Sequence, residues 1–152
     1  MNKKLKRTLI IAMVCCLISM LGTFAMQANW GKTKVTQYTV SLSELGRMID
    51  TNNAAYGKNI QTSFVRNDSI ISFAVYEPKS ADGRSVPGIV CTHGGYNQKE
   101  MQMQNYIELA RRGFVVVTYD WAGHGRTDMA VDSATGGSNG MIAMVEYIMS
   151  LK

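Results

Sequence analysis

The sequence has few cysteines, and this shortage excludes several classes of protein. Only three of the 152 residues are cysteine. Cys15 and Cys16 lie in an apolar N-terminal run, which leaves Cys91 alone in the rest of the chain. A single cysteine cannot build a disulfide framework, and no CxxC or Cys/His pair has the spacing of a metal site. We therefore expect no disulfide framework, no metal and no cofactor.

Excess charge is also scarce once the N-terminus is set aside. The net charge is +5, and Lys3, Lys4, Lys6 and Arg7 supply four of these charges. The remaining charges are nearly balanced, and no basic stripe is interleaved with aromatic residues. We therefore expect no nucleic-acid partner.

A long apolar run follows the basic cluster. Residues 9–26 are interrupted only by Ser19 and Thr23, and they reach the lower end of the length that spans a bilayer core. The cationic flank should stay inside, so residues 1–28 predict a single-pass membrane anchor with the folded part outside the cytoplasm. The alternative is a signal peptide, in which Thr23 and Ala25 are modest cleavage-site residues and the product is secreted.

Residues 29–59 are predicted to form a linker and a short helix. Residues 29–39 are polar, as in a juxtamembrane linker. Ser41 and Glu44 have the spacing of a capping box, in which each side chain binds a free amide at the start of a helix. We expect this helix to end near Asp50.

Four segments between residues 60 and 152 predict the strands of an α/β domain. Residues 60–65 and 69–76 flank a polar turn, which indicates an antiparallel edge hairpin. Residues 88–92 and 114–119 are apolar at consecutive positions, which is typical of parallel strands that are buried on both faces.

Two further segments predict helices. Residues 97–112 would be the crossover helix between the two parallel strands, with Gly113 placed to end it. Residues 140–152 carry apolar side chains on one face. A strand, a helix and a strand, with glycines after each strand, are typical of a parallel α/β sheet, in which ligands bind just outside the strand ends.

Two loops rich in glycine and histidine lie at these strand ends. His93, Gly94 and Gly95 directly follow one strand, and residues 120–127, with the sequence DWAGHGRT, follow the other. In this order and context, the loops resemble the oxyanion-hole loop and the D-x-x-G-H-G-x-S/T loop of the α/β-hydrolase superfamily of serine hydrolases, esterases and serine aminopeptidase-like enzymes. The resemblance covers residues 62–152 and implies the N-terminal half of such a sheet.

The resemblance implies hydrolysis of an ester, a thioester or an amide in a small-molecule or peptide substrate. The backbone of Gly95, with Tyr96 beside it, would form the oxyanion hole, because glycine allows a close approach to the backbone. An acid or base role for either histidine is the alternative to a structural one. The residues expected to support the loops structurally are His93, Gly94, Asp120, Gly123, His124 and Gly125, with Arg126 helping to hold the second turn.

The letters of a nucleophile motif occur without its context. Residues 136–140 read G-G-S-N-G, but a nucleophile elbow needs a strand directly before the serine, and an acid and a histidine after it. Residues 128–135 are polar, and no histidine follows Ser138. We therefore predict that Ser138 is a loop or N-cap residue and that Cys91 is a small buried strand residue. No catalytic residue is assigned.

The sequence as a whole predicts a membrane-anchored, extracytoplasmic α/β-hydrolase that is present as a truncated N-terminal portion. The nucleophile elbow, the acid and the catalytic histidine would be missing, so we expect the 152 residues to be inactive by themselves. Two alternatives remain open: a non-catalytic membrane-anchored binding domain, and a nonfunctional remnant of a hydrolase.

Overall fold

The chain divides into two units, Met1–Lys32 and Thr33–Lys152. The computed structural model describes residues 11–21, 32–81, 84–129 and 138–151. The first unit contains a helix over residues 11–21. Within the described ranges, no helix is both long enough and apolar enough to cross a membrane. The predicted anchor, residues 9–26, lies partly outside those ranges.

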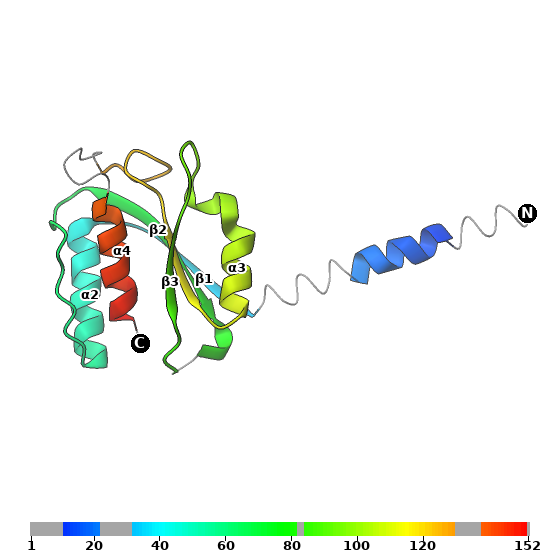
Figure 1. The fold of residues 1–152 in the computed structure, drawn as a ribbon, viewed down its shortest axis with the longest axis horizontal. Coiled ribbons are helices and arrows are strands. Elements are labelled where there is room, and N and C mark those ends of the chain that lie inside the picture. Colours follow the sequence, from blue (N-terminus) through cyan, green and yellow to red (C-terminus); the bar gives the residue numbers. More distant parts are fainter. Residues whose placement is uncertain (1–10, 22–31, 82–83, 130–137, 152) are drawn as a thin grey trace, which may run out of the picture. The chain divides into compact units, whose positions relative to one another are not determined.

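A four-stranded sheet forms the centre of the second unit, with the order β1-β2-β4-β3 (Figure 1). β1 is antiparallel to β2, and β2 is antiparallel to β4. β3 and β4 are parallel, as the sequence predicts. The strands are β1 (Thr33–Ser41), β2 (Ile70–Pro78), β3 (Gly88–Thr92) and β4 (Val115–Tyr119).

The hairpin prediction is wrong about which strand pairs with β2. The partner is β1, which lies in the segment predicted to be a linker. β1 is an edge strand with one wet face: Tyr38 and Val40 pack against the core, whereas Gln37 and Thr39 are exposed. Because one face of β1 is polar, the strand lacks the continuous apolar run by which the other strands are predicted from the sequence.

The structure describes residues 60–65 as irregular, although they were predicted to be a strand. Side chains, and not a neighbouring strand, bind their backbone groups. Asn53 bonds both the amide and the carbonyl of Ile60, and Glu146 accepts from the amide of Ser63. Phe64 is buried in the core and Ile60 packs against it, so the segment covers the domain without joining the sheet.

The helices cover both faces of the sheet, with α2 (Leu42–Tyr56) and α4 (Ser138–Ser150) on one face and α3 (Met103–Arg111) on the other (Figure 1). α2 begins as predicted, because the hydroxyl of Ser41 accepts from the amide of Glu44 at 3.1 Å. It continues past the predicted end at Asp50, to the left-handed Gly57. Short 3₁₀ helices precede α3 and follow β2: η2 (Lys99–Gln102) and η1 (Lys79–Ala81).

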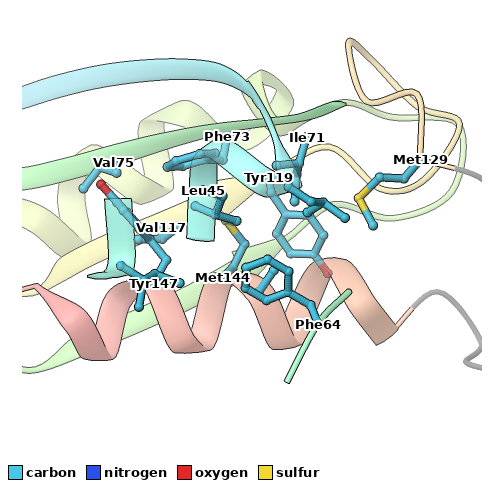
Figure 2. Packing of buried hydrophobic residues seen from close by; sticks show 13 residues of the cluster. Leu45, Phe64, Ile71, Phe73, Val75, Val117, Tyr119, Met129, Met144 and Tyr147 are labelled. Carbon is cyan, nitrogen blue, oxygen red and sulfur yellow. The ribbon is translucent and has the colours of Figure 1, made fainter. Parts of the chain in front are cut away.

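The larger core lies between the sheet and the pair α2 and α4 (Figure 2). Phe73 stacks on Tyr38 with ring centroids 4.7 Å apart, and its ring meets the edge of Tyr147 at 5.0 Å. A smaller core lies under α3, around Tyr76 and Tyr106. The main cluster shown in Figure 2 includes Leu45, Phe64, Ile71, Phe73, Val75, Val117, Tyr119, Met129, Met144 and Tyr147.

Two elements differ in burial from the sequence expectation. β3 was expected to be buried on both faces, but it lies at one edge of the sheet and its side chains from Ile89 to Thr92 are only half-buried. α4 buries Met144 and Tyr147, whereas Met141, Val145 and Met149 remain exposed on its outer side. Apolar side chains thus cover the outer side of α4 as well as the side that packs against the sheet.

Candidate functional site

The two predicted loops leave the sheet side by side. Thr92 pairs with Tyr119 at the carboxyl ends of β3 and β4. His93 and Asp120 are the next residues after these two strands, so both loops begin at the same carboxyl end of the sheet. This is the end at which open α/β sheets bind ligands.

The first loop contains two glycines that the fold does not require. Gly94 and Gly95 both have φ outside the left-handed region. A Cβ added at Gly95 would meet no described atom within 4 Å, and one added at Gly94 would approach only the side chain of Asn97, at 3.9 Å. Tyr96, in contrast, is a fully exposed residue with φ +61. This left-handed conformation is strained by about 1–2 kcal/mol for a residue with a Cβ.

Both ring nitrogens of the buried His93 are bonded to the backbone. Its Nε2 lies 3.1 Å from the amide nitrogen of Trp121, and its Nδ1 lies 2.8 Å from the carbonyl oxygen of Gly94. An amide can only donate, so Nε2 must be the acceptor, and the ring proton resides on Nδ1. His93 is therefore a neutral bridge between the two loops, and neither nitrogen is free to act as a base.

Three rings fill the space between the loops. The His93 ring centroid is 5.5 Å from that of Trp121 and 5.4 Å from that of His124. The indole N–H of Trp121 donates to the hydroxyl of Thr92, and Nδ1 of His124 lies 3.1 Å from the carbonyl oxygen of Ala122. These contacts bind the second loop to the end of β3.

A buried ion pair forms the second connection between the loops. The carboxylate of Asp120 accepts from the amide of Lys99 at 2.7 Å, from its ammonium at 2.9 Å and from the amide of Arg126 at 3.2 Å. Burial alone would raise the pKa of Asp120, but these hydrogen bonds, with the charge of Lys99, hold that pKa below its usual value. Asp120 is therefore an ionised structural centre of the site.

The glycines of the second loop, unlike those of the first, are required by the fold. Gly123 and Gly125 have φ of +71 and +54. A Cβ at Gly125 would lie 2.6 Å from Oδ1 of Asp120 and closer still to its other carboxylate atoms. The loop then returns to β2, where the hydroxyl of Thr127 accepts from the amide of Ser72 at 3.0 Å.

Lys99 is the member of the site that no sequence motif predicts. An acidic residue directly after a buried strand should itself be buried, and a buried carboxylate needs a cationic or amide partner. Lys99 is the first cation after His93 in the loop of the neighbouring parallel strand. The parallel pairing of the two strands therefore pointed to Lys99, whereas no sequence motif marks it.

The two nucleophile candidates lie in different elements of the fold. Ser138 is the first residue of α4, and residues 130–137 before it lie outside the described ranges. Cys91 is half-buried within β3, and burial raises the pKa of its thiol, which opposes thiolate formation. In the part of the chain that the structure describes, no group of three or more His, Cys, Asp or Glu side chains could hold a metal ion.

Comparison with protein-family models and with curated proteins finds no match for this sequence. The structure is similar to hypothetical protein PA2218 from Pseudomonas aeruginosa, with a TM-score of 0.52 and 21% identity over 77% of this chain and 30% of that chain. A thioesterase domain from the curacin biosynthetic pathway aligns with a TM-score of 0.42 and 20% identity, over 62% of this chain and 33% of that one. Esterase B from Lactobacillus rhamnosis (HN001) aligns with a TM-score of 0.34 and 15% identity, over 73% and 32%. The chain thus spans about a third of the length of these solved chains.

Identities this low bear on the fold and not on the activity. Two features that the sequence resemblance implies are present: a helix connects two parallel strands, and both loops lie at the carboxyl ends of those strands. The antiparallel pair that opens the sheet is formed by β1 and β2 and not by the predicted hairpin. The described part of residues 33–152 is therefore a mixed α/β domain with a four-stranded sheet, consistent with part of an α/β-hydrolase fold.

Proposed function

We propose that residues 94–96 form the oxyanion-binding turn of a hydrolase that acts on esters, thioesters or amides. The observation that carries this proposal is the position of glycine in the turn, which is the reverse of what backbone strain would favour. Gly95 stands where alanine would fit without strain, and Tyr96 stands where glycine would be relaxed. A chain selected only for stability would have the opposite arrangement. A strained backbone next to an open space that a ligand can enter is typical of ligand-binding turns.

The chemistry of acyl transfer explains why such a turn is useful. Attack on a carbonyl carbon places negative charge on the carbonyl oxygen, and backbone amides that already point at that oxygen stabilise it without reorganisation. Loss of one such donor typically lowers kcat by about 10²–10³-fold. Without a Cβ at Gly94 or Gly95, a substrate can come within hydrogen-bond distance of these amides.

The nucleophile, the acid and the base are proposed to lie in further polypeptide that completes the sheet. The composition of β3 supports this: Ile89, Val90 and Cys91 are consecutive, yet the strand lies at the sheet edge with one side unpaired among the described residues. Strands of this composition are usually covered on both faces and paired on both sides. The chain of hypothetical protein PA2218 is also more than twice as long, since 77% of this chain covers only 30% of it.

A membrane location is proposed from the N-terminal sequence. The basic cluster at residues 3–7 and the apolar residues 9–26 would anchor the protein with its folded unit outside the cytoplasm. Protease added to intact cells should then degrade residues 33–152, and the protein should stay with membranes in alkaline carbonate. A mature protein lighter by the first ~25 residues would instead establish a cleaved signal peptide.

The hydrolase is tested with the longest native form that contains these residues. The substrates are p-nitrophenyl esters and an acyl thioester, and the variant is Gly95→Ala. We expect hydrolysis by the wild type and a loss of roughly 10²-fold in kcat in the variant, because the added methyl group displaces the carbonyl by about 1 Å. The unfolding midpoint should not fall and should rise slightly, since the methyl group meets no described atom and alanine reduces the entropy of the unfolded chain.

Gly57→Ala is the matched control, because it adds the same methyl group at an open position outside the site. It should leave kcat unchanged. Full activity in Gly95→Ala would exclude the oxyanion role of this turn. No hydrolysis by the longest native form would favour the non-catalytic binding domain.

A further inference from the structure

Residues 94–96 are held from both sides by the loop that follows β4. On the N-terminal side, Nε2 of His93 accepts from the amide of Trp121. On the C-terminal side, Lys99 binds Asp120 through both its main chain and its side chain. The exposed and strained Tyr96 lies between these two attachments. A strained residue persists only where its surroundings fix it, and these contacts are the ones that bracket it.

Asp120 also caps the start of η2, which the side chain of the N-cap residue does not. Gln98 stands at the N-cap of η2, but its side chain makes no capping bond within the described structure. The first amide of η2, that of Lys99, donates instead to Asp120, 21 residues away. The carboxylate therefore caps a helix of the other loop, and the start of η2 is set by the position of β4.

The ion pair is better explained by geometry than by stability. The side chains of Lys99 and Asp120 are 4% and 1% exposed, so both charges have lost their water. A buried pair of this kind often stabilises a protein no more than apolar residues of similar volume would. What it supplies is a fixed distance and direction between two chain segments, because the buried ammonium of Lys99 is held between Asp120 at 2.9 Å and Glu100 at 2.8 Å.

We infer that Lys99 and Asp120 form a latch that sets the position of residues 94–96, and that Lys99 is a positioning residue for the oxyanion hole, given the function proposed above. When the Lys99–Asp120 pair is intact, the turn keeps the strained conformation that Tyr96 adopts. Without it, the turn relaxes, and the contact between His93 and Trp121 loosens with it. The charge of Lys99 itself takes no part in the chemistry.

The latch is tested first by NMR on the 152-residue chain, without any need for activity. Long-range ¹H–¹⁵N correlation of the imidazole reports which nitrogen of His93 carries the proton. The wild type should show the Nδ1–H tautomer alone, because Nε2 accepts from Trp121. Lys99→Met keeps the apolar stem and removes the ammonium, and it should give a mixture of tautomers and a shifted Trp121 amide. Lys99→Arg should restore much of the wild-type spectrum.

Two further variants keep the test decisive. Glu100→Gln alters the other partner of the ammonium, which is partly exposed, and should leave the His93 tautomer unchanged. If Lys99→Met does not fold because it leaves a buried charge unpaired, the double variant Lys99→Met/Asp120→Asn removes both charges and should still show the mixed tautomer. A folded double variant with His93 wholly in the Nδ1–H form would overturn the latch and leave the pair with a structural role only.

Hydrolysis by the longest native form separates this inference from the proposed function. If both are correct, the double variant lowers kcat about tenfold or more at an unchanged KM, since only transition-state contacts are lost. If the tautomer shifts but the wild type hydrolyses nothing, the latch stands and the proposed function fails. If the wild type is active and the double variant keeps both its kcat and its tautomer, the latch fails alone.

Discussion

Replacement of Gly125 by alanine tests how tightly the second loop is built around Asp120. Two effects add at this position. With φ at +54, any Cβ is strained by about 1–2 kcal/mol. The same Cβ would lie 2.6 Å from Oδ1 of Asp120, whereas ordinary contacts begin near 3.4 Å. The carboxylate or the turn must therefore move by close to 1 Å.

A shift of that size is incompatible with the bonds that Asp120 makes. Its contacts with the amide and the ammonium of Lys99 are 2.7 and 2.9 Å long, and both would lengthen beyond hydrogen-bond distance. Breaking a buried pair is destabilising by about 3–5 kcal/mol, because the charges remain buried. With the backbone strain, we expect Gly125→Ala to lose about 4–7 kcal/mol of unfolding free energy.

Gly57→Ala isolates the backbone strain. Gly57 also has a left-handed φ, +64, but a Cβ there would meet no described atom within 4 Å. This variant should lose only about 1 kcal/mol, because alanine also reduces the entropy of the unfolded chain. Urea denaturation followed by far-UV circular dichroism measures both values. Equal losses in the two variants would refute the packing described around Asp120.

Three other perturbations follow from the same contacts. Tyr96→Gly should raise the unfolding free energy by about 0.5–1 kcal/mol, because it relieves a left-handed conformation at an exposed position; a drop in the urea midpoint would contradict this strain. Asp120 has a lowered folded-state pKa, so its contribution is present above the unfolded value of about 3.9 and is lost as the pH falls through the folded-state pKa. Asp120→Asn should therefore reduce stability at pH 7 and flatten the acid limb of a stability profile; an unaltered limb would exclude this carboxylate as its source. Phe73→Ala should lose about 3–5 kcal/mol in thermal or urea unfolding, because the ring is fully buried and stacked on Tyr38; a loss below 1 kcal/mol would contradict the packing shown in Figure 2.

The elements that the sequence predicted correctly have local signals. β3 and β4 are continuous apolar segments that end in glycine-rich loops, and Ser41 marks the start of α2 through its own hydroxyl. These features depend on neighbours a few residues apart. Backbone preference and hydrophobic pattern therefore suffice to find them.

The elements that the sequence did not reveal depend on distant partners. β1 is half polar, and it is a strand only because β2 offers it a full register from Thr33 to Ser41. Lys99 belongs to the site only because parallel pairing brings its loop beside Asp120. Such contacts are decided by topology, and no short sequence window contains them.

The central claim, that residues 94–96 bind an oxyanion, is tested most directly by the structure of a transition-state analogue complex. The experiment uses the longest native form of the protein treated with a phosphonate ester that mimics the tetrahedral intermediate. We expect a covalent adduct with an anionic oxygen about 2.7–3.1 Å from the amide nitrogen of Gly95. An adduct whose oxygen is bound elsewhere, or the absence of any adduct, would contradict it.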